Sequence, residues 1–211
     1  MKKHLIIFSI IAVVMALSCA AGFAAEKPVK IGVLDVPRLY KDAPRIKQFA
    51  EQLDAFKKEL SLKLEIRGKN MFLAEDEINE LVETKIKTNP TDADKARIKA
   101  LEDKNLAVDS ELKSLTQTNP LNEEQKARQK AIQDAYAKAS KNGEAMQADY
   151  NDLLNSKGKD LDDKLSKEID AAVKKHAEEN SFTFIVDKQA VLFGGIDITD
   201  TIISKMVRKA D

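Results

Sequence analysis

The chain has few of the residues that build compact enzymes and sheet-rich domains. Tryptophan is absent, aromatic residues make up 5% of the sequence, and seven glycines and five prolines occur among 211 residues. Charged residues, by contrast, make up 33%, against about 25% in an average domain. This composition argues against a β-sandwich or an α/β enzyme and favours long, solvent-exposed helices.

Cysteine and an excess of either charge are also lacking. The single Cys19 excludes a disulfide framework and a cysteine-rich zinc site within one chain. The 35 basic residues are balanced by 35 acidic ones, so bulk charge does not indicate nucleic-acid binding. The sequence contains no glycine-rich phosphate loop, nucleophile elbow or triad pattern. We therefore predict that the protein is not an enzyme and uses no cofactor.

The N-terminal segment has the pattern of a secretory signal peptide. Two lysines precede the run Leu5 to Leu17, in which only one residue is polar, and small residues follow it. This run is shorter than the roughly 20 residues that span a bilayer, and no later segment is apolar enough to do so. Cleavage after Ala24 or Ala21 fits the small residues, and we predict that residues 1–24 direct export to the periplasm.

Cys19 leaves an alternative open, because lipoproteins are cut immediately before a cysteine. They usually carry leucine three residues earlier, whereas Ala16 stands at that position here and Leu17 follows it. Ordinary cleavage is therefore preferred over lipidation. Loss of the signal peptide removes two lysines and no acid, so the remaining chain has two more acidic than basic residues.

Both ends of the exported chain contain short alternating segments that predict β-strands. Near its start, the segment 29–33 alternates apolar residues with Lys30 and Gly32. Near its end, the segment 182–187 reads F-T-F-I-V-D and alternates likewise. The two predicted faces of this second strand are Phe182, Phe184 and Val186 on one side, and Thr183, Ile185 and Asp187 on the other.

Two further features lie near the C-terminus. The segment 190–193 is a third short apolar run, which Gly194 and Gly195 close as a turn. The segment 198–209 predicts an amphipathic helix with Thr199 as its N-cap. The apolar stripe of this helix consists of Ile202, Ile203, Met206 and Val207.

The long middle of the chain shows helical periodicity that only two prolines interrupt. Both stand in Thr-Asn-Pro, at 88–90 and 118–120, and proline ends a helix or forms a turn. A similar acidic helix start follows each proline, D-A-D-K-A-R and E-E-Q-K-A-R, which indicates an internal duplication of about thirty residues. The predicted helices cover 43–87, 92–117 and 122–180. Asn105, the polar member of a heptad stripe, is predicted to fix coiled-coil register.

The path of these helices has two possible forms, since both chain ends should share one sheet. A single hairpin at 118–120 leaves a mismatch of about 25 Å at about 1.5 Å per residue. A further turn at Asn142 and Gly143 removes the mismatch, and we prefer this four-segment path. The heptad stripe, however, continues through Gly143 and favours one unbroken helix.

The two ends carry a family resemblance. The segments K-I-G-V-L-D-V-P-R-L-Y (30–40) and F-T-F-I-V-D-K-Q-A-V-L-F (182–193), with D-I-T-D (197–200) after them, resemble the Skp/OmpH family of periplasmic chaperones. This resemblance implies a trimer in which three chains pool their strands into a central β body. It further implies that the helical arms surround a cavity, where unfolded outer-membrane proteins are held without ATP.

We therefore predict an α+β fold, predominantly α, with a small β body and a long antiparallel coiled-coil arm. The body is assigned to 25–42 and 181–211 and the arm to 43–180. The predicted body and trimer core is Ile31, Val33, Phe182, Phe184, Val186, Leu192, Ile202 and Met206. The candidate client contacts are Met71, Phe72, Tyr136, Met146 and Tyr150, although the same residues could form coiled-coil core.

The predicted function is that of an ATP-independent periplasmic holdase for unfolded outer-membrane β-barrel proteins. The alternative is a coiled-coil spacer in the cell envelope, anchored by lipid if Cys19 is modified. A homotrimer is expected, without nucleic acid or a stable membrane span, and the near-neutral charge argues against a lipopolysaccharide or membrane partner. His176 is expected in a solvated or interface position, because a zinc site would need three or four clustered ligands.

Overall fold

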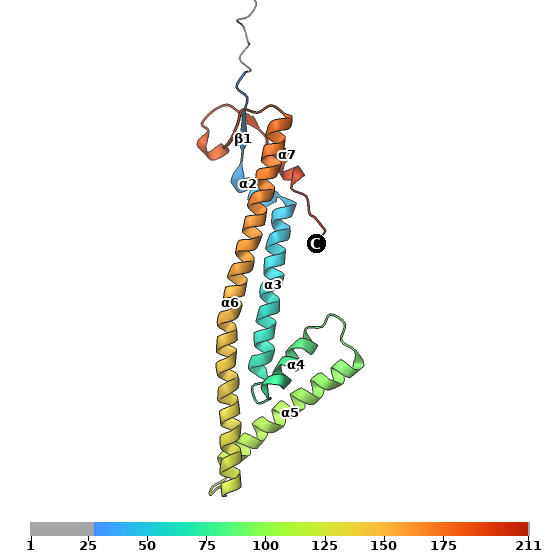
Figure 1. The fold of residues 1–211 in the computed structure, drawn as a ribbon, viewed down its shortest axis with the longest axis vertical. Coiled ribbons are helices and arrows are strands. Elements are labelled where there is room, and N and C mark those ends of the chain that lie inside the picture. Colours follow the sequence, from blue (N-terminus) through green and yellow to red (C-terminus); the bar gives the residue numbers. More distant parts are fainter. Residues whose placement is uncertain (1–27, 211) are drawn as a thin grey trace, which may run out of the picture.

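A computed structural model describes residues 28–210, and Figure 1 shows a long helical arm with a small sheet at one end. The elements in chain order are β1 (Ile31–Leu34), α2 (Val36–Asp42), α3 (Pro44–Lys69), α4 (Glu75–Lys85), α5 (Asp92–Gln117), α6 (Glu123–Glu179), β2 (Phe184–Asp187), the 3-10 helix η1 (Lys188–Ala190), β3 (Ile196–Asp197) and α7 (Thr199–Lys205). The predominantly α fold with a small β body is confirmed. The predicted signal peptide and Cys19 lie outside the described residues.

Strand β1 is the middle strand of a three-stranded sheet, and both of its neighbours run parallel to it. Ile31 pairs with Phe184 of β2, while Gly32 pairs with Ile196 of β3. A Cβ atom at Gly32 would lie 3.0 Å from Cγ1 of Ile185. Glycine at this position therefore lets the side chains of β2 lie close against the backbone of β1.

The third strand of the sheet does not coincide with the apolar run 190–193. The apolar run 190–193 ends η1 and enters a loop, and β3 begins only after Gly194 and Gly195. Both glycines have positive φ angles, 88° and 86°, which side-chain-bearing residues rarely adopt. A side chain at Gly195 would also collide with Val33. The two glycines thus turn the loop away from the sheet before the chain rejoins it.

The predicted face of Phe182 is wrong, while the alternation predicted for residues 184–187 agrees with strand β2. Phe182 and Ile185 pack toward the buried core, whereas Phe184 is 59% exposed on the opposite face of the sheet. Phe182 precedes the strand and follows Ser181, whose φ angle is 53°. This change of backbone direction interrupts the two-residue alternation, so Phe182 does not share a face with Phe184.

One hydrophobic core joins the body to the base of the arm. We call it the base cluster, and its buried members are Leu34, Leu39, Ala43, Ile46, Phe49, Leu161, Leu165, Ile198, Ile202 and Met206. They come from β1, from α2 and α7, and from the neighbouring parts of α3 and α6. Pro44 begins α3 at its first position, as predicted, and proline fits there because no helical hydrogen bond is lost.

Helix α6 is unbroken over 57 residues, so the preferred four-segment path is wrong. Gly143 lies inside this helix, with open space where a side chain would project. The chain reverses at a place that the sequence analysis missed, between the end of α3 at Lys69 and the start of α4 at Glu75. The predicted helix over 43–87 is therefore two helices.

Two asparagines stabilise this reversal. Asn70 donates a hydrogen bond from Nδ2 to the carbonyl oxygen of Ile66, at 2.7 Å. Asn105 of α5 accepts one from the backbone N–H of Phe72 (3.1 Å) and donates one to the carbonyl oxygen of Lys69 (3.2 Å). Asn105 therefore binds the backbone of the turn instead of fixing coiled-coil register.

The two Thr-Asn-Pro segments form helix breaks, as predicted, and their surroundings repeat. Arg97 of α5 makes two hydrogen bonds to Glu80 of α4, and Arg128 of α6 makes two to Glu111 of α5. In each case the arginine lies 17 residues after its partner. The internal duplication is thus visible as two helical hairpins held by the same arginine–glutamate contact.

The α4–α5 hairpin lies beside the far part of the arm and has its own core (Figure 1). We call this core the elbow cluster, and its buried members are Ile66, Leu73, Ile78, Leu81, Leu101 and Ala139. They come from α3, the turn after it, α4, α5 and α6. The arm is therefore thicker at its far end than a simple pair of helices.

Candidate functional site

The β body carries large apolar side chains that are open to solvent. We call this surface the body patch, and its members are Val29, Ile31, Phe184, Leu192, Phe193 and Ile196. Leu192 and Phe193 are almost fully exposed, at 105% and 98%. Val29, Ile31 and Ile196 line one hollow, while Leu192 and Phe193 line another over Val33. Several large apolar side chains exposed on one small body are typical of an interaction surface.

The predicted body-core residues fall into three groups within one chain. Val33, Ile202 and Met206 are buried, at 5%, 0% and 3% exposure. Phe182 and Val186 are half-buried. The other three, Ile31, Phe184 and Leu192, belong to the body patch. Their role as a core between copies of the chain stays a prediction.

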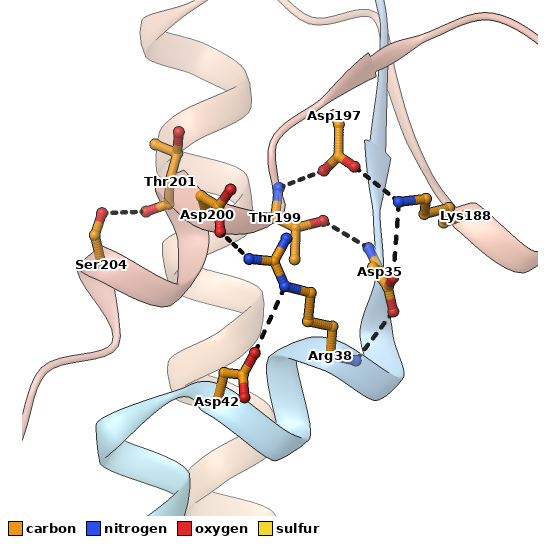
Figure 2. A network of polar contacts seen from close by, with 9 residues as sticks. All are labelled: Asp35, Arg38, Asp42, Lys188, Asp197, Thr199, Asp200, Thr201 and Ser204. Atoms are coloured by element: carbon orange, nitrogen blue, oxygen red, sulfur yellow. Dashed lines mark hydrogen bonds and ion pairs between the residues drawn. The ribbon is translucent and has the colours of Figure 1, made fainter.

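A network of polar contacts holds the loops of the body in place (Figure 2). Thr199 is fully buried, and its Oγ1 accepts a hydrogen bond from the backbone N–H of Asp35 at 2.9 Å. Asp197 accepts one from the N–H of Thr199 (2.9 Å) and one from Nζ of Lys188 (3.0 Å). The hydrogen bonds with Thr199 come first among the causes that lower the pKa of Asp197 to about 2, followed by that with Lys188.

This network corrects the prediction for the final helix. Thr199 is the first residue of α7 and not its N-cap, which is Ile198, and the side chain of Asp197 accepts the hydrogen bond from the N–H of Thr199. The helix ends at Lys205, so the predicted continuation to Lys209 is wrong. Arg38 of α2 contacts Asp200 and thereby ties α7 to the segment after β1.

His176 is buried, with 8% of its surface exposed, so the solvated alternative is wrong and the interface alternative stays a prediction. Its ring lies 5.6 Å from that of Phe182, and Asn180 Nδ2 lies 3.1 Å from its Nδ1. Burial is the main cause that lowers the pKa of His176, and Lys205 of α7 and Lys30 before β1 lower it further. Glu179 acts in the opposite direction.

Because its pKa is lowered on folding, His176 is expected to make the body less stable in mild acid. Below pH 6.5, the ordinary pKa of histidine, His176 takes up a proton in the unfolded chain but resists doing so in the folded chain. The free energy of unfolding therefore decreases as the pH is lowered. Above 6.5 the effect vanishes. Urea unfolding measured from pH 7.5 to 5 should show this loss in the natural protein and a smaller loss in His176→Gln. Parallel curves for both proteins would contradict the assignment.

The predicted client contacts lie around the reversal after α3 and on the facing part of α6. Phe72 and Tyr136 contact each other, with ring centroids 5.1 Å apart. Met71 packs against the elbow cluster, while Met146 and Tyr150 are half-buried on α6. Tyr136 is the most accessible of the five, at 38% exposure. The structure thus brings Phe72 and Tyr136 together, whereas Met71 contributes to packing inside the arm.

Arg67 is a buried cation at the elbow that the sequence analysis did not single out. Its side chain is 2% exposed and contacts Glu75, while Nη1 donates a hydrogen bond to Asn79 at 3.1 Å. Asn142 of α6 donates to the second oxygen of Glu75 at 2.8 Å. Burial lowers the pKa of Arg67. The network links α3, α4 and α6, and no periodicity in the sequence distinguishes Arg67 from its surface neighbours.

A groove with an apolar floor lies between α3, α4 and α5. Leu62, Ile66, Ile98 and Leu106 contribute its apolar surface, and Leu106 is 61% exposed. The charged residues along it pair with one another, Glu65 with Lys69 and Lys85 with Glu102. The groove therefore has an almost neutral rim and an accessible apolar interior.

The sequence that forms this parallel sheet and the arm inserted between β1 and β2 matches the model of a known family. The family model for "Outer membrane protein (OmpH-like)" covers residues 30–206, from the residue before β1 to the residue after α7. The chain belongs to the OmpH family. No curated protein and no solved structure matches it.

Membership of the OmpH family supports a chaperone-like role in the periplasm, and the family is not one of enzymes. Within residues 28–210, no helix is both long and apolar enough to cross a membrane. The same part of the chain contains no group of three or more histidine, cysteine or acidic side chains arranged for a metal ion. The described surfaces that fit a role in binding other chains are the body patch and the arm.

Proposed function

We propose that this OmpH-family protein is an ATP-independent holdase, which binds unfolded outer-membrane proteins in the periplasm and prevents their aggregation during transit. One observation carries the proposal: a long helical arm extends from a small body that exposes several large apolar side chains. The signal-peptide pattern supports export, with cleavage preferred over lipidation at Cys19. The near-neutral charge gives no support to a lipopolysaccharide or membrane role.

The surface of the arm suits weak contacts with many different chains. Exposed apolar side chains, Leu62, Leu106, Tyr136 and Leu153, are spaced along it between charged residues. Each contact with an unfolded client is weak, but several contacts on one client raise the overall affinity through effective concentration. We propose these residues as client contacts, together with Met71, Phe72, Met146 and Tyr150.

We further propose that three chains associate through the body patch. The single chain leaves Ile31, Phe184 and Leu192 exposed on its three-stranded sheet and the loop beside it, and neighbouring copies would cover them. In this arrangement, the segments 25–42 and 181–211 form the assembled body and 43–180 forms an arm. The arms of three chains would then surround a common space for the client.

Suppression of aggregation tests the proposed function. A urea-unfolded outer-membrane β-barrel protein is diluted into buffer containing residues 25–211, without nucleotide, and light scattering is followed. We expect suppression that saturates near three chains per client. Failure to suppress at several-fold excess, by a folded helical trimer, would contradict the proposal and favour the alternative, a coiled-coil spacer in the envelope.

A matched pair of variants separates client binding from general solubility. Leu106→Ser combined with Leu153→Ser removes two exposed apolar contacts from the arm and should weaken suppression without unfolding the helices. Tyr40→Ser removes a residue of similar exposure, 49%, from α2 in the body region and should leave suppression unchanged. Equal effects of both changes would argue against contacts along the arm.

A further inference from the structure

The segment that follows α7 lies along the beginning of α3 and is held there by its backbone. Nε2 of Gln48 donates a hydrogen bond to the carbonyl oxygen of Lys209 at 2.7 Å. The backbone N–H of Lys209 donates one to Oε1 of the same glutamine at 3.0 Å. One side-chain amide thus satisfies both the donor and the acceptor of a single residue, as a neighbouring β-strand would.

The orientation of this amide is set by buried charges behind it. Nη1 of Arg45 donates to Oε1 of Gln48 at 2.8 Å, and both side chains belong to residues that are only 9% exposed. Arg45 also makes two hydrogen bonds to Glu168 of α6, at 2.9 and 3.0 Å, and lies over the ring of Phe49. Because Arg45 can only donate, Oε1 must be the atom that faces it, and the amide has one orientation.

This arrangement recognises a main chain without reading the side chain attached to it. Every residue except proline offers the same N–H and C=O groups that Lys209 presents to Gln48. The side chains of the segment add only peripheral ion pairs, Arg208 with Glu51 and Lys209 with Glu168. A site of this kind suits segments that differ in sequence but share an accessible backbone.

The apolar surface needed for such segments lies directly beyond the tail. A groove of about 650 Å³ between α3 and α6 has Ala210 at its edge. Its apolar lining consists of the half-buried Phe56 together with the buried Phe49 and Leu161 of the base cluster, and Glu59 and Lys164 are among its charged residues. The groove therefore combines apolar contacts with the backbone-binding amide, and the tail covers the amide end.

We infer that the groove between α3 and α6 at the base of the arm is a binding site for a backbone-exposed segment of an unfolded polypeptide, and that residues 207–210 occupy its Gln48 end as an internal competitor. The inference rests on the proposed holdase function for the identity of the occupant. The tail is tethered, so its effective concentration at the groove is high, on the order of millimolar. A client must therefore displace it.

Release of the tail should strengthen client binding. A chain that ends at Met206 lacks the competitor but keeps the carbonyl oxygen of Met206, which accepts a hydrogen bond from the N–H of Arg45. Its affinity for a labelled, urea-unfolded outer-membrane β-barrel protein is measured by fluorescence anisotropy. We expect it to bind at least about fivefold more tightly than the full mature chain, the equivalent of about one net hydrogen bond. Equal or weaker binding by the truncated chain, with unchanged helicity, would overturn the inference.

Two further variants keep the test decisive. Arg208→Glu combined with Lys209→Glu loosens the tail without deleting it, so it should increase affinity even if the truncated chain folds poorly. Gln48→Leu in the truncated chain should cancel the gain, whereas Gln147→Leu, at an exposed position on α6, should not. The assignment of this groove to a client segment would be overturned if the gain in client affinity remained after Gln48→Leu. It would also be overturned if the gain appeared only when the truncated chain formed larger assemblies than the full mature chain.

A synthetic peptide separates failure of this inference from failure of the proposed function. A labelled peptide V-R-K-A-D, the sequence of residues 207–211, should bind the truncated chain and not its Gln48→Leu variant. If the peptide binds specifically but no client binds, the groove is supported as a backbone-binding site and the proposed holdase function is contradicted. If clients bind but the peptide shows no binding that depends on Gln48, the holdase function is supported and the assignment of the groove as a binding site is overturned.

Discussion

Replacing Phe184 with glutamate is expected to convert the proposed trimer into folded monomers. Phe184 is 59% exposed in the single chain, so a charged side chain there can remain solvated and the chain can fold. In an assembly built on the body patch, three carboxylates would instead be buried without partners, which strongly disfavours association. Sedimentation velocity should show a decrease from the mass of the proposed trimer to that of one chain, and circular dichroism should show unchanged helix content.

Leu153→Glu is the matched control for this experiment. Leu153 is also exposed, at 49%, but it lies on α6 in the arm and not in the body patch. We expect this variant to keep the mass of the natural assembly while it loses some affinity for clients. If Phe184→Glu and the natural protein sediment alike, the body patch is not the surface that joins the chains.

Leu81→Ala is expected to release the α4–α5 hairpin while the body stays folded. Leu81 is fully buried in the elbow cluster, and truncating a buried leucine to alanine costs about 2–5 kcal/mol. The elbow cluster and the base cluster share no residue, so the loss should remain local. Hydrogen exchange followed by mass spectrometry should show faster exchange over 75–117 and unchanged exchange over β1 and α7.

Ile202→Ala is the reciprocal change, because Ile202 is fully buried in the base cluster. It should accelerate exchange in α7, α2 and β1 and leave the α4–α5 hairpin protected. If each variant accelerates exchange equally in both regions, the arm and the body unfold as one cooperative unit. The two clusters would then not be independent in stability, although they share no residue.

The features that could be predicted from sequence are those whose cause is local. The two Thr-Asn-Pro segments end helices because proline cannot continue them, and α5 spans Asp92–Gln117 as predicted. Pro44 likewise marks the start of α3. The class of fold and the family followed from the strand patterns at both ends, which are short but carry apolar alternation that is distinct from the helical middle.

The features that were missed depend on contacts between distant residues. The reversal after Lys69 depends on Asn105, which lies 36 residues further along the chain and occupies a position that also fits a heptad stripe. The acidic run E-D-E at 75–77 is a helix-start signal that could have indicated the break. Gln48 and Arg45 look like ordinary surface residues until α6 and the C-terminal tail are placed beside them.

The placement of β1 between β2 and β3 has a consequence for the order of folding. Lys30, next to β1, contacts Thr183, which is 153 residues away, so the sheet closes a very long loop. The helical hairpins involve much shorter separations, such as the 17 residues between Glu80 and Arg97. Contacts between residues close in sequence form faster than distant ones. We therefore expect the arm to fold while β1 is still unpaired, and the body patch to form only after the last strand has been synthesised.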